Sequence, residues 1–370
     1  MEASEVSEQY KAGSLTLAGA VAMGTGVMIG AGIFALTGQV AELSGPLFPL
    51  AFLLAAVISG FSAYTYIKVS NKYPSAGGIA MILKKAYGPA TITGGAALLM
   101  AFSMIINESL VARTFATYTL RLFDLENTEI LVPVLALGLI VFAFLVNIAG
   151  NQIIGGLSKV AAIAKIGGIL VFATLVLWAA GFSFQPAASG IAGETSATGF
   201  LAGVALAILA FKGFTTITNS GGEVKNPNRN VGRAIMISLA ICLVVYMLVA
   251  FAVGSTLSIS EIVQARDYSL AEAARPAFGE AGVWFTVYLV MDVIIHWGVL
   301  RRLREDVGAN PVVLICAILF DLVALGAFLV MKAMSDPAII VISATGIIAI
   351  FVFEKFYLSR RRTTNENHAA

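Results

Sequence analysis

Apolar stretches recur along most of the chain, and short polar segments separate them. A stretch of about 20 apolar residues predicts a helix that crosses a lipid bilayer, because a helix of that length spans the hydrocarbon core. The pattern therefore predicts an all-α polytopic membrane protein. The ten predicted spans cover residues 15–38, 46–70, 90–121, 130–150, 157–181, 196–220, 231–255, 278–300, 311–332 and 337–358.

Two of the connecting segments contain enough apolar residues to form helices of their own. The segment 72–89, KYPSAGGIAMILKKAYGP, is mildly apolar and bracketed by lysines, as in a helix that lies in the membrane interface or re-enters the membrane. The segment 258–279 is amphipathic and is suited to cap an outward vestibule. A plain surface helix without a gating role is the alternative for both segments.

The distribution of positive charge predicts the orientation of the spans in the membrane. The chain is 59% hydrophobic and 12% charged, with a net charge of only +2, so the total charge carries little information. If the N-terminus is inside, most of the 23 lysines and arginines fall in cytoplasmic segments, as positive residues usually do. We therefore predict a multi-pass protein of the cell membrane with both termini cytoplasmic, including tails at 1–14 and 359–370.

The sequence contains no motif of the residue types that bind metals or act in catalysis. Cys242 and Cys316 lie singly in apolar spans, and His296 and His368 form no ligand motif. The predicted cytoplasmic segments contain no glycine-rich nucleotide-binding loop. We therefore predict a protein that is not an enzyme, uses no cofactor or metal, and binds no nucleic acid.

The first predicted span contains four glycines in the stretch GTGVMIGAGIF at 24–34. Glycine weakens a helix, and a helix broken inside a bilayer leaves backbone N–H and C=O groups unpaired. Such a break persists where it is buried in protein or lines a binding cavity. Close packing of helices is the alternative, because Gly26 and Gly30 form a small-xxx-small pair.

The sixth predicted span contains a second interruption. In FLAGVALAILAFKGFTTITNSGGEVKNPNRN, Gly213 lies mid-span beside Lys212, and three threonines follow within five residues. Transporters built from inverted repeats place broken helices at matching positions of their two halves. The first and sixth spans match in a five-plus-five repeat, so the two interruptions together favour a substrate-binding site whose main chain uncoils in both spans.

Three motifs occur in order between residues 15 and 290: GTGVMIGAGIF, YPSAGGIAMILKKAYG and AFKGFTTITNSGGEVKNPNRN. They resemble the signatures of the amino acid–polyamine–organocation transporter family, which includes the amino acid permeases. The resemblance implies the LeuT-type fold, with inverted five-helix repeats, broken first and sixth helices and alternating access. It implies a first repeat at 15–181 and a second repeat with C-terminal helices at 196–358.

The same resemblance implies how a small substrate would be bound. Its α-carboxylate would meet backbone N–H groups of the first-span glycine motif, and its α-amino group would face carbonyls of both interruptions. Phe211 would occlude the substrate and Phe214 would flank it, although ordinary packing is the alternative for both. The implied substrate-binding residues are Val27, Met28, Ile29, Gly30, Ala31, Gly32, Phe211, Gly213 and Phe214.

Two lysines inside predicted spans are candidates for function. Lys165, in KIGGILVF, resembles a fifth-helix lysine that in some family members takes the place of a coupling sodium ion. A lysine there can release and regain a proton, so we predict proton coupling through Lys165, with a snorkelling side chain as the alternative. Lys212 either contacts the substrate or pairs with Glu108 of the third span.

Three further ionisable residues lie in the second half of the chain. Asp292 and His296 share a helix face near an arginine-rich end, which favours a wet boundary site over a proton relay. Asp321 lies in the ninth span, and the sequence does not name its partner.

The chain departs from the family in its second half. Family members usually have twelve spans, whereas here AGVWFTVYLV resembles the start of an eighth helix and MDVIIHWGVLRRLRE the end of a tenth. An internal deletion of about two helices is one interpretation, and a minimal chain of ten core helices is the other.

Taken together, the motifs predict secondary active transport of amino acids or related amines, driven by protons or by exchange. The alternative is a membrane-embedded amino-acid-binding or scaffold protein that does not cycle, because the second repeat is shortened. An ion channel is disfavoured, since the sequence shows no repeated charge rings.

Overall fold

The computed structural model describes residues 12–29, 31–122, 128–148, 163, 166–171, 173–174, 177–178, 181, 196–256, 258–266, 295–335 and 337–369. Within these residues the regular structure is helical apart from one isolated parallel bridge between Leu15 and Val224. The helices are α1 (Leu17–Met28), α2 (Ala31–Ser44), η1 (Gly45–Leu47), α3 (Phe48–Lys72), α4 (Gly78–Tyr87), α5 (Thr91–Leu122), α6 (Thr128–Ile148), α9 (Ala197–Phe211), η2 (Lys212–Phe214), α10 (Thr215–Asn219), η3 (Gly221–Glu223), α11 (Pro227–Thr256), α12 (Ile259–Arg266), η5 (Val299–Leu303), α15 (Pro311–Ser335) and α16 (Pro337–Ala369).

Several of these helices have the length and composition of membrane spans. The stretches Leu36–Lys72, Ala197–Asn219, Pro227–Ser255 and Ile340–Ser359 are long and apolar enough to cross a membrane. Shorter apolar helices occur elsewhere, for example at Leu17–Met28. The prediction of a helical membrane protein is therefore confirmed at this level. The predicted span 278–300 lies largely outside the described residues, and the span 157–181 is described only in short pieces.

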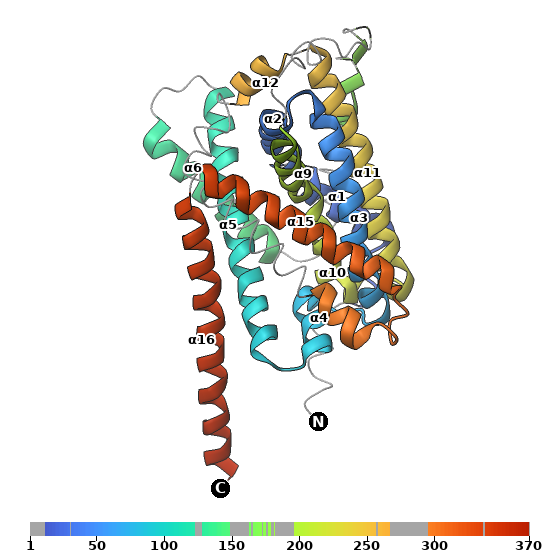
Figure 1. Cartoon of the computed structure of the whole chain (residues 1–370), viewed down its shortest axis with the longest axis vertical. Coiled ribbons are helices and arrows are strands. Elements are labelled where there is room, and N and C mark those ends of the chain that lie inside the picture. The colour runs from blue at the N-terminus through green and yellow to red at the C-terminus, as the bar shows by residue number, and fades with distance from the viewer. Residues whose placement is uncertain are drawn as a thin grey trace.

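The central bundle is formed by α1, α2, α3, α9 and α11 (Figure 1). α9 is its most enclosed member, with contacts to α2, α3 and α15. Small residues allow these close contacts: a Cβ atom on Gly203 of α9 would lie 1.9 Å from the Ser44 hydroxyl at the end of α2. The core around the two interrupted spans is therefore tightly packed and has little freedom to accept larger side chains.

The outer helices α5, α6, α15 and α16 expose apolar side chains, such as Phe144, as expected of surfaces that lipid covers. α16 lies alongside α5 (Figure 1). Glycines allow this contact, because a Cβ atom on Gly95 would lie 2.6 Å from the Phe351 ring.

Both connecting segments that were predicted to be helical contain a helix. α4 occupies the segment 72–89, and α12 occupies the start of the segment 258–279, of which residues 267–279 lie outside the described residues. α4 and the C-terminal end of α16 lie at the lower end of the molecule in Figure 1, and α12 lies at the upper end. The segment before α1 also pairs with the segment before α11, because the Lys225 N–H donates to the Leu15 carbonyl (2.8 Å).

Candidate functional site

The first span is broken where its glycines predicted. α1 ends at Met28 because Ile29 has an extended backbone, with φ −84° and ψ 91°. Gly30 lies outside the described residues, and α2 begins at Ala31. The last carbonyls of α1 and the first N–H groups of α2 therefore lack partners within their own helices.

The sixth span is interrupted differently from the prediction. Between α9 and α10 the chain forms a single 3₁₀ turn, η2, and does not uncoil. Lys212 (φ −73°, ψ −10°) keeps right-handed helical angles, so one glycine tightens this helix without unwinding it. The expectation of an uncoiled main chain is therefore wrong for the sixth span, and only the first span has a true break.

The two interruptions contact each other directly through Gly213. A Cβ atom on Gly213 would lie 2.7 Å from the Met28 Cγ atom and 3.0 Å from the Met28 backbone nitrogen. One turn away from this contact, a Cβ atom on Gly24 would lie 2.5 Å from the Ile217 Cδ1 atom. Glycine is therefore required at Gly213 for close approach and not for an unusual backbone angle.

Tyr246 of α11 joins the two interruptions from a third helix. Its fully buried hydroxyl lies 2.6 Å from the Met28 carbonyl oxygen and 2.9 Å from the Ala210 carbonyl oxygen. The hydroxyl has one hydrogen, so it donates to one of these carbonyls at a time. Tyr246 is absent from the sequence-based candidates, although a lone tyrosine in an apolar span signals a buried partner for its hydroxyl.

The aromatic candidates lie in two different environments. Phe211 and Phe214 are fully buried. The Phe211 ring packs edge-on against Tyr246, with centroids 4.9 Å apart, and the Phe214 ring packs against Tyr66 of α3 at 5.4 Å. Val27, by contrast, is 48% exposed, although its side chain borders the contact, because a Cβ atom on Gly213 would lie 2.9 Å from the Val27 Cγ1 atom.

Lys212 is buried at the start of the 3₁₀ turn. Its ammonium donates to the Ser62 hydroxyl of α3 (2.9 Å) and lies 6.0 Å from the Phe214 ring centroid. Glu108 is exposed on α5, and no ion pair between described residues joins it to Lys212.

Some candidates cannot be placed. Gly30, Lys165 and Asp292 lie outside the described residues. Ala31 and Gly32 begin α2, and for these two residues only the helical backbone is described.

His296 and Asp321 form a buried pair that the sequence did not reveal. His296 Nε2 lies 3.2 Å from Asp321 Oδ2, and both side chains are fully buried. The atoms are within ion-pair distance but are not aligned as a hydrogen bond. The expected wet boundary site at His296 is therefore wrong, because His296 is enclosed by protein and Asp321 of α15 is its partner. Within the described residues no group of three His, Cys, Asp or Glu is placed to hold a metal.

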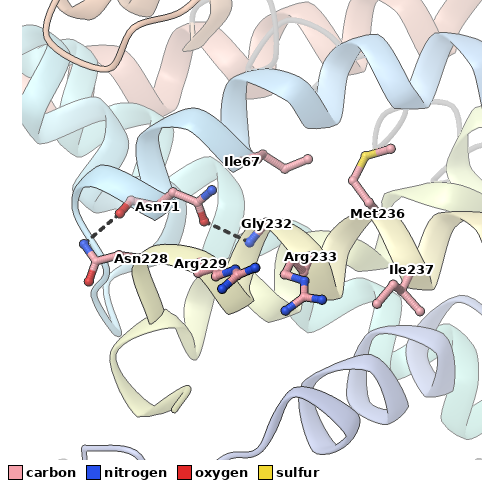
Figure 2. Close-up of a pocket in the computed structure, with 8 residues that line it drawn as sticks. All are labelled: Ile67, Asn71, Asn228, Arg229, Gly232, Arg233, Met236 and Ile237. Atoms are coloured by element: carbon pink, nitrogen blue, oxygen red, sulfur yellow. Dashed lines mark hydrogen bonds between the residues drawn. The ribbon is translucent and has the colours of Figure 1, made fainter. Parts of the chain in front are cut away.

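A groove of about 600 Å³ lies between α3 and α11, near the end of α3 and the start of α11 (Figure 2). A smaller, apolar cavity of about 40 Å³ lies among α3, α9 and α15. Neither contains a residue of the two interruptions.

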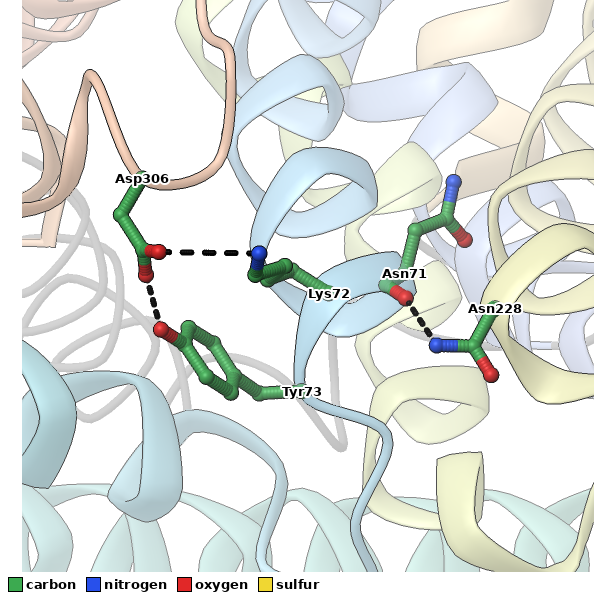
Figure 3. A network of polar contacts seen from close by, with 5 residues as sticks. All are labelled: Asn71, Lys72, Tyr73, Asn228 and Asp306. Carbon is green, nitrogen blue, oxygen red and sulfur yellow. Dashed lines mark hydrogen bonds and ion pairs between the residues drawn. The ribbon is translucent and has the colours of Figure 1, made fainter.

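Polar contacts connect three segments next to the groove (Figure 3). The Asp306 carboxylate accepts from the Tyr73 hydroxyl and lies 3.6 Å from the Lys72 ammonium, while the Asn228 amide donates to the Asn71 carbonyl (2.9 Å). The hydrogen bond to Asp306 raises the pKa of Tyr73 above its ordinary value. The protonated hydroxyl is thus favoured, so this contact persists at neutral pH and weakens only as the pH rises through the raised pKa.

Replacing Tyr246 by phenylalanine is expected to lower thermal stability, because the Met28 and Ala210 carbonyls lose their buried donor. An unsatisfied buried polar group costs about 1–3 kcal/mol. The melting temperature of the full chain in detergent measures the effect. Tyr357→Phe is the control, since Tyr357 is exposed on α16. Equal melting temperatures for the two variants would contradict a bridging role for Tyr246.

Comparison with known proteins adds a further finding. A family model described as amino acid permease matches residues 15–300. An uncharacterized protein of Methanocaldococcus jannaschii is 31% identical over 299 residues, which cover 78% of this chain and 68% of that protein. The inner membrane transport protein YbaT of Escherichia coli is 31% identical over 292 residues, 78% of this chain and 65% of YbaT.

A plant relative is similar over a comparable part of this chain. Cationic amino acid transporter 3, mitochondrial, of Arabidopsis thaliana is 31% identical over 311 residues, which cover 76% of this chain and 48% of that protein. The matched region thus spans about two-thirds of the length of the two microbial relatives and about half of the plant relative.

Proposed function

The chain belongs to the amino acid permease family, and from this membership we propose that it carries amino acids or related amines across the cell membrane by alternating access. The family and its named relatives are transporters and not enzymes. One observation supports the proposal above the others: the break between α1 and α2 lies in contact with the 3₁₀ turn of the sixth span.

Substrate recognition follows from the chemistry of the break. A helix start offers free N–H groups and a partial positive charge, which suit a carboxylate. α2 starts at Ala31, so the α-carboxylate binds near Ile29–Gly32. The α-amino group binds carbonyls at the end of α1, where the Tyr246 hydroxyl now lies 2.6 Å from the Met28 oxygen. The Met28 oxygen has two lone pairs, so it can accept from the amine as well as from this hydroxyl, and Phe211 closes over the substrate.

The substrate side chain is constrained by charge. Lys212 is a buried cation next to Phe214, and like charges placed together cost several kcal/mol. We infer that the protein prefers amino acids with neutral side chains over cationic ones, by at least about tenfold in uptake.

Energy coupling is assigned to protons, with Lys165 as the group that binds and releases them. Both termini are assigned to the cytoplasm on the basis of the charge distribution. The first repeat at 15–181 and the second repeat with C-terminal helices at 196–358 provide the elements that move relative to one another, whether the second repeat has lost about two helices or belongs to a minimal chain of ten core helices.

A non-cycling binding or scaffold protein is the second candidate. The family match and the transporter names of the relatives do not favour it. Such a protein would bind an amino acid saturably and would not exchange it across a membrane.

Transport in proteoliposomes tests the proposal. A thermal-shift screen of the purified full chain against amino acids and polyamines first identifies a ligand. Counterflow of the labelled ligand into preloaded vesicles is then expected, together with faster uptake when a proton gradient is imposed. Lys165→Ala is expected to retain counterflow and to lose the response to the gradient.

The outcomes separate the candidates. Binding without counterflow would reject transport and support the scaffold. Counterflow of arginine equal to that of leucine would reject only the inferred charge selectivity, and undiminished gradient-driven uptake by Lys165→Ala would reject only the assigned coupling residue.

A further inference from the structure

The groove between α3 and α11 has a basic end and an apolar end (Figure 2). Arg229 and Arg233 are one helical turn apart on α11, and Figure 2 shows them side by side along the same stretch of the helix. Met236 and Ile237 follow further along α11, and Ile67 of α3 lies over Gly232. The groove thus changes from cationic to apolar along the axis of a predicted membrane span.

Specific contacts hold the two walls of the groove together. The Gly232 N–H donates to the Asn71 side-chain oxygen (3.0 Å), and the Asn228 amide donates to the Asn71 carbonyl (2.9 Å). A Cβ atom on Gly232 would lie 2.7 Å from the Ile67 Cγ2 atom, so only glycine allows this approach. The shape of the groove is therefore determined by the packing of α3 against α11.

The two guanidinium groups are available to bind an anion. Arg229 and Arg233 are exposed, and no ion pair between described residues joins either of them to a carboxylate. The residues that line the groove, all of them described, include no aspartate or glutamate. Paired guanidinium groups match the geometry of a phosphate, to which arginine donates two parallel hydrogen bonds.

An apolar stripe continues from the basic end along the membrane-spanning part of α11. Met236 is 52% exposed, Ile237 39% and Val244 56%. These positions lie within Pro227–Ser255, which is long and apolar enough to cross a membrane. Inorganic phosphate has no apolar part that could contact this stripe, whereas the acyl chain of a lipid would cover it.

We propose that this groove binds one anionic phospholipid, with Arg229 and Arg233 holding the phosphate and the stripe from Met236 to Val244 contacting an acyl chain. Asn71 and Asn228 line this end of the groove, and Asn71 directly precedes Lys72 in the segment that the charge distribution predicts to be cytoplasmic (Figure 3). Each basic residue at a membrane surface strengthens binding to anionic lipid, so the pair is expected to favour it roughly 10- to 30-fold over zwitterionic lipid.

Native mass spectrometry of the detergent-purified full chain tests the proposal. The chain is titrated separately with phosphatidylglycerol, with phosphatidylcholine and with inorganic phosphate. The unmodified chain is expected to retain one phosphatidylglycerol at roughly 10- to 30-fold lower concentration than phosphatidylcholine, and no phosphate. Arg229→Gln/Arg233→Gln is expected to bind both lipids alike.

A matched variant controls for the loss of charge. Lys84→Gln/Lys225→Gln also removes two exposed positive charges, neither of which lines the groove, and it is expected to keep the preference for phosphatidylglycerol. If the double arginine variant does not fold, Arg229→Gln and Arg233→Gln are measured singly, each with an expected loss of about 3- to 5-fold.

Three results would overturn the proposal. These are an unchanged lipid preference in the arginine variants, an equal loss in the lysine variant, and retention of inorganic phosphate comparable to that of phosphatidylglycerol. The last result would identify a free-anion site in place of a lipid site.

Discussion

Gly213→Ala is expected to abolish most amino acid uptake while leaving the protein folded. The added Cβ atom would lie 3.0 Å from the Met28 backbone nitrogen, in addition to its contacts with the side chains of Val27 and Met28. The side chains can turn away, but the backbone of the break must move by a few tenths of an ångström. Overpacking of this kind costs about 1–3 kcal/mol. Because it destabilises the backbone arrangement of the proposed substrate site, uptake should fall roughly 10- to 100-fold.

Gly138→Ala is the matched control for this prediction. Gly138 lies in α6, where an added Cβ atom meets nothing within 4 Å, so uptake should be unchanged. Elution as a single species on size-exclusion chromatography would show that Gly213→Ala is folded. Uptake by folded Gly213→Ala at the level of Gly138→Ala would contradict a functional contact between the two interruptions.

The broken first span was predictable because several helix-weakening residues occur together. Four glycines between Gly24 and Gly32 lower helix propensity by about 1 kcal/mol each relative to alanine. In the sixth span, Gly213 is ten residues from the preceding glycine, Gly203, and the residues on both sides of Gly213 keep helical backbone angles. A single glycine in a well-packed helix permits close approach and does not unwind the chain. The sequence therefore indicated the position of the second interruption but not its geometry.

Contacts between distant helices could not be derived from local patterns. Tyr246 reaches Met28 across a separation of 218 residues and Ala210 across 36. Lys212 reaches Ser62 across 150 residues, whereas the sequence suggested Glu108 as its partner. Periodicity shows which face of a helix is apolar, but it does not show which buried polar group on another helix lies opposite. Each of these partners depends on how the bundle packs.

The pair of His296 and Asp321 gives the largest expected change in stability. Both side chains are fully buried, and the contact is an ion pair when the imidazole is protonated. Removing one partner of a buried pair leaves a polar group without compensation and costs about 3–5 kcal/mol. His296→Leu and Asp321→Leu should therefore each lower the melting temperature of the full chain in detergent by more than Tyr246→Phe does.

The double variant His296→Leu/Asp321→Leu distinguishes a paired interaction from a general effect of core mutation. Replacing both partners by apolar residues is often neutral or stabilising, so the double variant should melt above both single variants. Glu305→Gln is the surface control, because the Arg304–Glu305 pair is exposed and such pairs contribute little to stability.

The pair also contacts the proposed substrate site through Tyr66. The Tyr66 ring packs edge-on against both Phe214 and His296, with centroids 5.4 Å and 6.2 Å apart. Additive losses in the double variant would show that the two residues do not interact, and the pair would then have no role in holding the segment 295–298 against α15.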